Sequence, residues 1–331
     1  MKTQVLHVDP DHPDPETIAH AADLLRNGGL VGFPTETVYG LGANSLDPAA
    51  VARIFQAKGR PPQNPLIVHI ADMKTIPTLV ASWPDHATRL AKRFWPGPLT
   101  LVVQKSDCVP DAVTAGGSTV ALRMPAHPVA MALLKAANIP IAAPSANRSK
   151  LLSPTRAEHV LRGLDGRIDL LLDAGPTPGG LESTVLDVTT DTPRLLRPGL
   201  ISLAELEAVV GPINQKETEK GGDPLRSPGM LGRHYAPRTP LECLENGWQR
   251  VQELCRAGKR VGWLTFAEDT EPIQPELVAL TIPNDAASYA TQLYAALHTL
   301  DDAGLDCIVV DLPPKAEEWL AIHDRLRRAS R

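Results

Sequence analysis

Hydrophobic positions in this chain fall into short strand-like runs and helix-like stripes that alternate along most of its length. Leu30 to Phe33 and Pro65 to Ile70 are compact apolar runs, as in buried strands. Between them, the stretch from Asp47 to Lys58 carries apolar residues on one helical face. Asp47 is a good N-cap, and Gly59 suits the left-handed position that ends a helix. This order of strand, helix and strand predicts an α/β fold.

Similar patterns extend through the rest of the first two thirds of the chain. A helix is expected after Asp14-Pro15, and Gly28-Gly29 should end it. Further helices are expected near 85–94, 129–137, 155–162 and 202–210, and strands at 1–8, 99–103, 119–123, 139–143, 168–172, 183–188 and 194–197. The strands at 183–188 and 194–197 should form a pair around a turn.

The last ninety residues alternate more regularly. Helices are expected at 248–257, 285–300 and 315–328, and strands at 260–266, 277–282 and 307–312. Regular alternation predicts a parallel sheet with helices on its faces. A chain of 331 residues is also too long for one ordinary core. We therefore expect a domain at 1–210, a linker at 211–240 and a smaller Rossmann-like domain at 241–331.

Composition and charge narrow the functional classes. The net charge is -5, so no global basic field would recruit nucleic acid. The N-terminus has no apolar signal core and no run is long enough to span a bilayer, so we expect a cytoplasmic protein without membrane contact. The four cysteines form no CxxC pair, which favours reduced thiols over zinc ligands.

Several polar residues in turns could bind an anionic ligand, although each has a simpler structural explanation. The chain has no GxxxxGK[ST] loop, so any bound ATP would depend on side-chain cations and hydroxyls. Lys58 and Arg60 could be ordinary cations at a helix C-terminus. Ser145 and Asn147 could stabilise a turn after a strand. These alternatives stay open on the residues alone.

Longer sequence blocks favour ligand binding over these structural explanations. The blocks PTETVYGLGA, KGRP with NPLIVH, ALRMP, APSANRS and ESTVLD resemble the YrdC-like domain of the threonylcarbamoyl-AMP synthases. The resemblance spans about Gly29 to Pro237, and the rest is similar in pattern to the C-terminal domain of the long, two-domain form. It implies a YrdC-like twisted mixed-sheet α/β domain followed by a smaller Rossmann-like parallel one. Lys150 departs from the family pattern, in which a glycine is expected.

The resemblance also implies two sets of binding residues. The set expected to bind ATP is Lys58, Arg60, Ser145, Asn147, Arg197, His234 and Tyr235, of which Lys58 and Arg60 would be catalytic. The set expected to bind L-threonine is Thr35, His69, Arg123 and Ser183. An arginine can grip the threonine carboxylate bidentately. The linker would fold over the nucleotide, and His234 has no second histidine at zinc-ligand spacing.

The implied reaction joins L-threonine, bicarbonate and ATP into threonylcarbamoyl-AMP, with release of pyrophosphate and water. ATP would enter with Mg²⁺, no residue stands out as a general base, and no protein metal site is expected. A threonylcarbamoyl transferase would receive the product for N6-threonylcarbamoyladenosine in tRNA. The alternative is a double-stranded RNA-binding or ribosome-maturation module, with weak tRNA or RNA binding. Hydrogenase-maturation carbamoyltransferases are a third family, but the cysteine-rich zinc fingers they carry are missing from this sequence.

Overall fold

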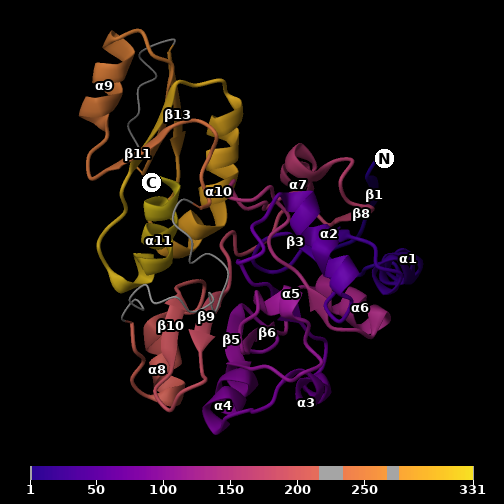
Figure 1. The fold of residues 1–331 in the computed structure, drawn as a ribbon. Helices are drawn as coiled ribbons and strands as arrows, with labels where there is room; N and C mark the ends of the chain where they lie inside the picture. The colour runs from indigo at the N-terminus through magenta and orange to yellow at the C-terminus, as the bar shows by residue number, and fades with distance from the viewer. Residues whose placement is uncertain (1, 216–233, 267–275, 331) are drawn as a thin grey trace.

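The computed structural model describes residues 2–215, 234–266 and 276–330, which fold around two separate sheets (Figure 1). The first sheet is mixed and has the strand order β1-β8-β2-β3-β7-β4-β6-β5-β9-β10. Its strands are β1 (Gln4–His7), β2 (Val31–Phe33), β3 (Gly40–Asn44), β4 (Ile67–His69), β5 (Leu99–Gln104), β6 (Thr119–Arg123), β7 (Ile141–Ala142), β8 (Leu170–Asp173), β9 (Thr184–Asp187) and β10 (Arg194–Arg197). As expected, β9 and β10 form an antiparallel pair.

Helices cover both faces of this sheet. They are α1 (Pro15–Arg26), α2 (Pro48–Lys58), α3 (Ile76–Leu79), α4 (Asp85–Phe94), α5 (Asp111–Thr114), α6 (Pro128–Ala137), α7 (Ala157–Leu164) and α8 (Leu203–Val210). On β8, Leu171 packs in the cluster that holds α2, α4 and α7, whereas Leu170 and Leu172 pack with α1 and α6. This alternation follows from the two-residue period of a strand.

The helix α2 begins and ends where the sequence predicts. Asp47 accepts a hydrogen bond from the backbone N–H of Ala49, and Gly59 has φ 59° in the left-handed region. Glycine adopts this conformation without the steric cost that a Cβ imposes. The turn fixes the direction of the chain that leads on to Arg60.

Strand β3 is the main element that the sequence pattern does not suggest. Its segment contains Gly40 and Gly42, and glycine is depleted in strands. A Cβ on Gly42 would lie 2.8 Å from a ring atom of Phe33 and 2.9 Å from a methyl group of Ile141. The glycine is therefore needed for packing against the neighbouring strands.

The second sheet is fully parallel, as the regular alternation predicts. Its order is β11-β14-β12-β13, with β11 (Leu241–Leu244), β12 (Val261–Thr265), β13 (Leu277–Thr281) and β14 (Cys307–Asp311). The accompanying helices are α9 (Trp248–Arg256), α10 (Ala286–Asp302) and α11 (Leu320–Ala329), and Glu317–Trp319 forms a short 3₁₀ turn before α11. No helix in the three described ranges is both long and apolar enough to cross a bilayer.

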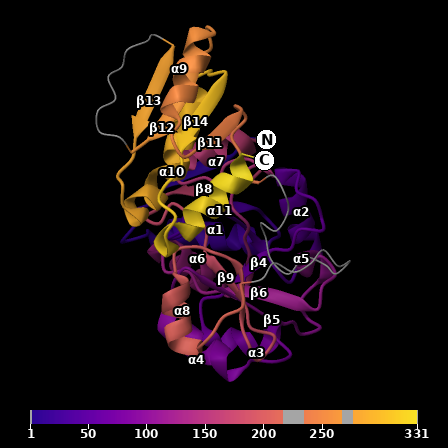
Figure 2. The same cartoon turned by 90° about the vertical axis from the view of Figure 1, so that its left-hand side faces the viewer.

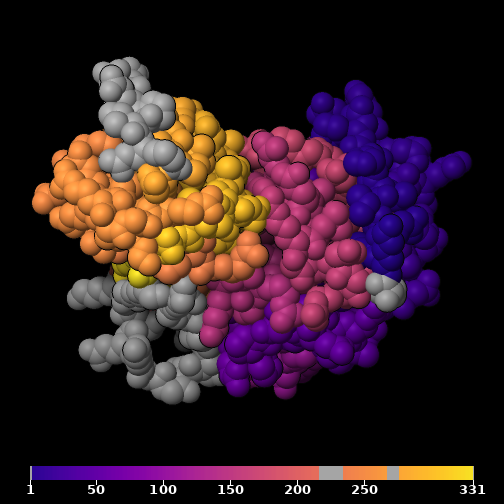
Figure 3. Space-filling view, turned by 90° about the horizontal axis from the view of Figure 1, so that it is seen from above, coloured from indigo at the N-terminus to yellow at the C-terminus, as the bar shows by residue number. Residues whose placement is uncertain are grey.

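The two domains share a core. Val38 and Leu181 of the first domain pack in the same apolar cluster as Leu293 and Leu297 of α10. Figures 2 and 3 show the C-terminal domain lying against the first domain, with α11 close to β9 in Figure 2. Residues 216–233 of the expected linker lie outside the described residues, whereas 211–215 and 234–240 are described.

Candidate active site

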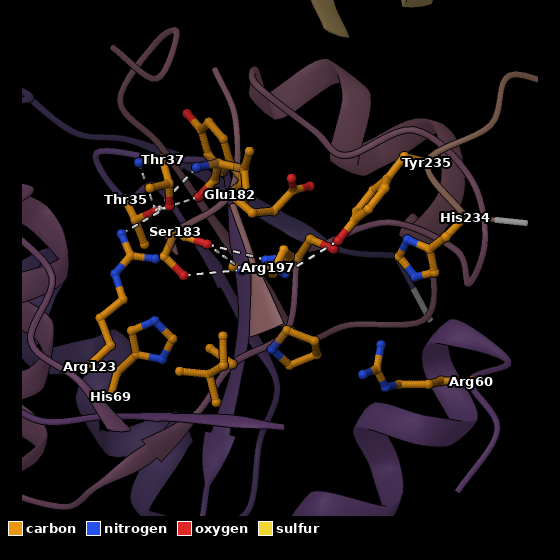
Figure 4. A pocket seen from close by; sticks show the side chains of 17 residues that line it. Thr35, Thr37, Arg60, His69, Arg123, Glu182, Ser183, Arg197, His234 and Tyr235 are labelled. Carbon is orange, nitrogen blue, oxygen red and sulfur yellow. Dashed lines mark hydrogen bonds between the residues drawn. The ribbon is translucent and has the colours of Figure 1, made fainter. Parts of the chain in front are cut away.

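A pocket lies over the middle of the first sheet, where segments from both halves of the chain meet (Figure 4). Its polar lining residues are Thr35, Thr37, Tyr39, Arg60, His69, Arg123, Ser145, Glu182, Ser183, Arg197, His234 and Tyr235. Figure 4 shows two ends: Arg123 and His69 lie at one, Arg60 and His234 at the other. The volume open to the centres of water molecules is ≈ 40 Å³. This is space for a few waters.

Strands β4 and β6 build the first end. They are adjacent and parallel, and their last residues, His69 and Arg123, are partners in the register. Val68 and Leu122 just before them pack in the apolar cluster with α2 and α4. Strand alternation therefore turns His69 and Arg123 to the opposite face, where the pocket lies.

Arg123 is held firmly by its neighbours. Its Nη2 donates to Oγ1 of Thr37 over 2.9 Å and lies 2.7 Å from Oε1 of Glu36, and its Nε donates to the Gly97 carbonyl over 3.3 Å. No described residue accepts a hydrogen bond from Nη1, although only 4% of the residue is exposed. One side of the guanidinium therefore remains for an anionic ligand.

His69 provides a neutral ring beside this cation. Burial lowers the pKa of its imidazole to about 3, and the charge of Arg123 acts in the same direction. Its Nδ1 has no hydrogen-bond partner within the described ranges. A buried polar atom without a partner is rare, and one that faces a pocket is available to a ligand.

Ser183 and Arg197 lie between the two ends (Figure 4). Arg197 donates from Nη2 to the Ser183 hydroxyl over 3.1 Å and to the Ser183 carbonyl over 2.9 Å. Its Nη1 donates to the Tyr235 hydroxyl over 3.2 Å. The second hydroxyl contact of Ser183 is Oγ1 of Thr100 at 2.8 Å. Arg197 thus links Ser183, which is expected to bind threonine, with Tyr235, which is expected to bind ATP.

Arg60 is the cation of the second end. Its Nε donates to the Asn64 carbonyl over 3.1 Å and its Nη2 to the Pro65 carbonyl over 2.8 Å, which fixes the guanidinium plane. His234 lies nearby, and burial together with the charge of Arg60 lowers the pKa of its imidazole to about 3. The His234 and Tyr235 rings are 4.1 Å apart in an edge-to-face arrangement. This end offers a fixed positive charge and flat aromatic surfaces.

Lys58 and Asn147 lie behind the pocket. The Lys58 ammonium donates to the backbone carbonyls of Ser145 and Asn147, and the backbone N–H of Ser149 donates to the Lys58 carbonyl. The Asn147 amide donates to the carbonyls of Arg148 and Leu151. Among the ATP candidates from this part of the chain, Ser145 and Arg60 line the pocket, and direct contact of Lys58 or Asn147 with ATP stays a prediction.

The Thr35 hydroxyl already has local partners. It donates to the Val38 carbonyl over 2.6 Å and lies 2.7 Å from Oγ1 of Thr37. These contacts match the structural alternative of a turn threonine, although Thr35 also lines the pocket. Its role towards threonine likewise stays a prediction.

Two family models match consecutive parts of this chain. Residues 23–199 match the Sua5, YciO and YrdC family described as "Telomere recombination", and residues 201–331 match the family described as "Threonylcarbamoyl-AMP synthase, C-terminal domain". The threonylcarbamoyl-AMP synthase of Bacillus subtilis is 47% identical over 342 residues, covering 100% of this chain and 98% of the relative. The chain belongs to the threonylcarbamoyl-AMP synthase family.

Other members of the family support the same assignment. The threonylcarbamoyl-AMP synthase of Pyrococcus abyssi is 44% identical and covers 94% of this chain, with 93% of the relative covered. The crystal structure described as P. abyssi Sua5 complexed with L-threonine matches with a TM-score of 0.91 and 42% identity, over 99% of this chain and 98% of that one. The expected fold class and the long, two-domain synthase form are therefore confirmed.

Some pocket residues of this synthase-family chain were not identified from the sequence. Glu182 lies in the ESTVLD block and lines the pocket, but a single carboxylate before a strand carries no sequence signal of its own. Arg325 of α11 contacts Glu182. The sequence carries a weak signal that Arg325 is buried. Ile322, Leu326 and Ala329 are buried on α11, and Arg325 falls on the same helical face.

No group of three or more histidine, cysteine or acidic residues that could hold a metal ion occurs within the described ranges. The acidic side chains nearest the pocket are already paired. Glu36 lies against Arg123, and Glu182 lies against Arg325. These residues are therefore a poor fit for a resident metal ion.

Proposed function

We propose that the protein is a nucleotidyltransferase that condenses L-threonine, bicarbonate and ATP into threonylcarbamoyl-AMP, releasing pyrophosphate and water. The observation that carries this proposal is one pocket with Arg123 at one end and Arg60 at the other. Two separated cations suit two anionic substrates that must meet between them. The name and coverage of the B. subtilis relative support the same reaction.

L-threonine would bind at the Arg123 end. The free side of the Arg123 guanidinium would take its carboxylate, and the hydroxyls of Ser183 and Thr35 would recognise the amino acid's polar groups. A site that hydrogen-bonds the substrate hydroxyl rejects analogues without it more strongly than an apolar site does. Neutral His69 adds a polar group without adding charge.

ATP would bind at the Arg60 end. Arg60 and Arg197 would contact the phosphates, Ser145 would donate a hydroxyl, and His234 and Tyr235 would lie against the nucleotide. Asn147 and Lys58 would act from behind, through the loop whose carbonyls Lys58 holds. Guanidinium groups match phosphate oxygens in geometry as well as in charge.

The chemical step joins two anions. Carboxylation of the threonine amine gives a carbamate, whose oxygen forms a bond to the α-phosphorus of ATP while the bond to the β-phosphate oxygen breaks. Pyrophosphate leaves with the electron pair of that bond. Positive charge at Arg60 and Arg197 would reduce the repulsion during the approach, and fixed positions would contribute much of the remaining barrier reduction.

Magnesium would arrive as part of the substrate. The residues around the pocket do not form a carboxylate site for it, so we propose that Mg²⁺ is bound by the ATP phosphates. Removing free magnesium should then abolish turnover without changing the folded protein's stability.

The buried wall of the pocket suits a product that water would destroy. Tyr235 and His234 are 2% and 5% exposed and form part of the wall. We propose that the segment 211–240 covers the nucleotide end between domains at 1–210 and 241–331; residues 216–233 of it lie outside the described residues. Exclusion of water would protect the mixed anhydride.

The fate of the product and any contact with RNA belong to the same proposal. We propose that a threonylcarbamoyl transferase takes the intermediate to tRNA, and that the reaction occurs in the cytoplasm. Direct tRNA or double-stranded RNA binding stays a prediction as a secondary property, because the chain is acidic overall. A salt titration tests it: weak, steeply salt-dependent and sequence-blind binding is the expected result.

Pyrophosphate release tests the proposed function. The purified protein is incubated with ATP and magnesium, and threonine or bicarbonate is omitted in turn. Release should require both. Equal pyrophosphate release without threonine would mean that the protein only hydrolyses ATP, and would contradict the proposal.

A further inference from the structure

Helix α11 places a cation directly behind two residues that line the pocket, Glu182 and Tyr235. Arg325 on α11 donates from Nε to Oε2 of Glu182 over 2.6 Å and from Nη2 to the Pro198 carbonyl over 3.0 Å. Its side chain is 1% exposed, whereas that of Arg327, two residues later, is 49% exposed. Arg327 faces outward, whereas Arg325 is buried in the domain contact. Its Nη1 also donates to Oδ2 of the buried Asp324 over 2.8 Å.

Glu182 depends on the C-terminal domain for much of its hydrogen bonding. Arg325 of α11 is one donor, and the Tyr294 hydroxyl of α10 lies 3.3 Å from each carboxylate oxygen. The Ser153 hydroxyl is the donor from the first domain. Without the C-terminal domain, this buried carboxylate would keep Ser153 and lose Arg325 and Tyr294.

The charge of Glu182 matters because of where it lies. Burial raises the pKa of its carboxyl, but the charges of Arg325 and Arg197 and the hydrogen bonds outweigh this and hold the pKa below its ordinary value. The group is therefore an anion in the lining of a pocket proposed to bind a triphosphate. Without a paired cation it would repel that ligand strongly, since buried charges are poorly screened.

Arg325 also contacts the aromatic wall. Its guanidinium carbon lies 5.2 Å from the centre of the Tyr235 ring, and the Tyr235 hydroxyl accepts from Arg197. A cation over an aromatic face is attracted by the ring. One side chain of the C-terminal domain thus contacts an anion and a ring that both line the pocket.

We propose that Arg325 is a positioning residue for ATP binding, which makes the docked C-terminal domain part of the active site. Arg325 compensates the charge of Glu182 and holds Tyr235 against Arg197, so the ATP end is complete only when α11 is in place. The inference rests on the proposed function. It assigns to the second domain a task beyond carrying the linker.

Two variants separate this role from a purely structural one. Arg325→Met removes the cation and leaves the Glu182 charge, whereas Arg325→Met combined with Glu182→Gln removes both charges at nearly the same volume. Both lose the Arg325 contacts, including the one with Asp324, and they differ only in the charge at position 182. Neutral replacements of a whole buried pair are often tolerated, whereas removal of one partner is costly.

The readout is the Kd for MgATP by titration calorimetry, at a temperature where circular dichroism shows each variant folded. We expect Arg325→Met to weaken binding by about tenfold or more, and the double variant to recover most of that loss. Equal Kd values for the two variants, or a wild-type Kd in Arg325→Met, would overturn the inference. This binding measurement does not depend on turnover, so failure of the proposed reaction would show separately in the pyrophosphate assay.

A matched control and a milder variant complete the design. Arg250 forms a two-bond pair with Glu242 on the surface of the C-terminal domain, with distances of 2.9 and 3.0 Å. Arg250→Met should leave the Kd for MgATP within about twofold of wild type. Where Arg325→Met does not fold, Tyr294→Phe removes one donor from Glu182 and should raise the Kd about two- to fivefold. An unchanged Kd in Tyr294→Phe would count against the inference.

Discussion

The two ends of the pocket differ in how they are built. At the proposed threonine end, His69 and Arg123 terminate neighbouring strands of one sheet, and the supports of Arg123, Thr37 and Glu36, come from the same domain. At the proposed nucleotide end, Arg60 follows a helix, whereas Tyr235 lies within the expected linker at 211–240 and contacts Arg325 of the second domain. The Arg123 end is therefore positioned by neighbouring strands of one sheet. The Arg60 end is complete only where the two domains meet.

This difference assigns different tasks to the two halves of the chain. The sheet can preorganise recognition of a small amino acid, because neighbouring strands fix the positions of His69 and Arg123. The nucleotide end can change with the relative position of the domains. We therefore expect threonine recognition to tolerate changes in the C-terminal domain that weaken ATP binding.

The largest expected effect comes from Arg123→Ala at the threonine end. It removes the proposed carboxylate partner and leaves Glu36 buried without its cation. Threonine affinity should fall by about 100-fold or more, corresponding to about 3 kcal/mol. Calorimetry with threonine measures this directly. As a control, Arg89→Ala on the exposed side of α4 should bind threonine normally; full affinity in Arg123→Ala would remove Arg123 from the site.

Arg197→Ala should affect both ends, because Arg197 joins Ser183 to Tyr235. Loss of these charge-assisted hydrogen bonds should lower kcat/KM for both substrates by about 10- to 100-fold. Steady-state pyrophosphate release at varied threonine and varied ATP separates the two. A change confined to one substrate would show that the ends are independent.

Acid should destabilise both ends through their buried histidines. The folded pKa values of His69 and His234 are about 3, below the ordinary value of 6.5, so the unfolded chain binds protons first as the pH falls. The free energy of unfolding should therefore decrease from pH 6.5 towards pH 3. Each histidine contributes a slope of up to about 1.4 kcal/mol per pH unit.

Denaturant unfolding between about pH 6.5 and 5 measures this slope before most carboxylates titrate. His69→Asn and His234→Asn should each flatten it, since each removes one buried imidazole. If the slope of both variants equals that of the wild type, the imidazoles are not the source of the acid sensitivity.

Tyr235→Phe should have the smallest effect. The variant keeps the ring over which Arg325 lies and loses the hydroxyl that accepts from Arg197. One hydrogen bond is worth about 0.5–1.5 kcal/mol, so the KM for ATP should rise about two- to tenfold. The KM for threonine should stay near its wild-type value; an equal rise in both would place Tyr235 in threonine recognition too.

The sequence predicts the elements whose signals are local. Asp47 and Gly59 bound α2 because capping and left-handed turns depend on a few adjacent residues. Strand β3 is missed because the reason for its glycines lies in neighbouring strands that contact Gly42 from other parts of the chain. Local propensity cannot describe such a contact.

Contacts between distant parts of the chain also limit what the sequence predicts of the site. Family blocks indicate Arg123, Arg197 and Tyr235, all of which line the pocket. They also indicate Lys58, which the structure places behind the pocket among backbone carbonyls. Arg325 lies in an arginine-rich stretch near the C-terminus, and its partner Glu182 is 143 residues away in the chain. Pairings over such distances come from the folded structure.

The central claim is that threonine and ATP bind at opposite ends of one pocket. Its most direct test is a crossed titration of Arg123→Ala and Arg60→Ala with threonine and with MgATP, each alone. We expect Arg123→Ala to lose threonine affinity and keep MgATP affinity, and Arg60→Ala to do the reverse. If Arg60→Ala binds MgATP as tightly as wild type, or if both variants weaken the same ligand, the account is contradicted.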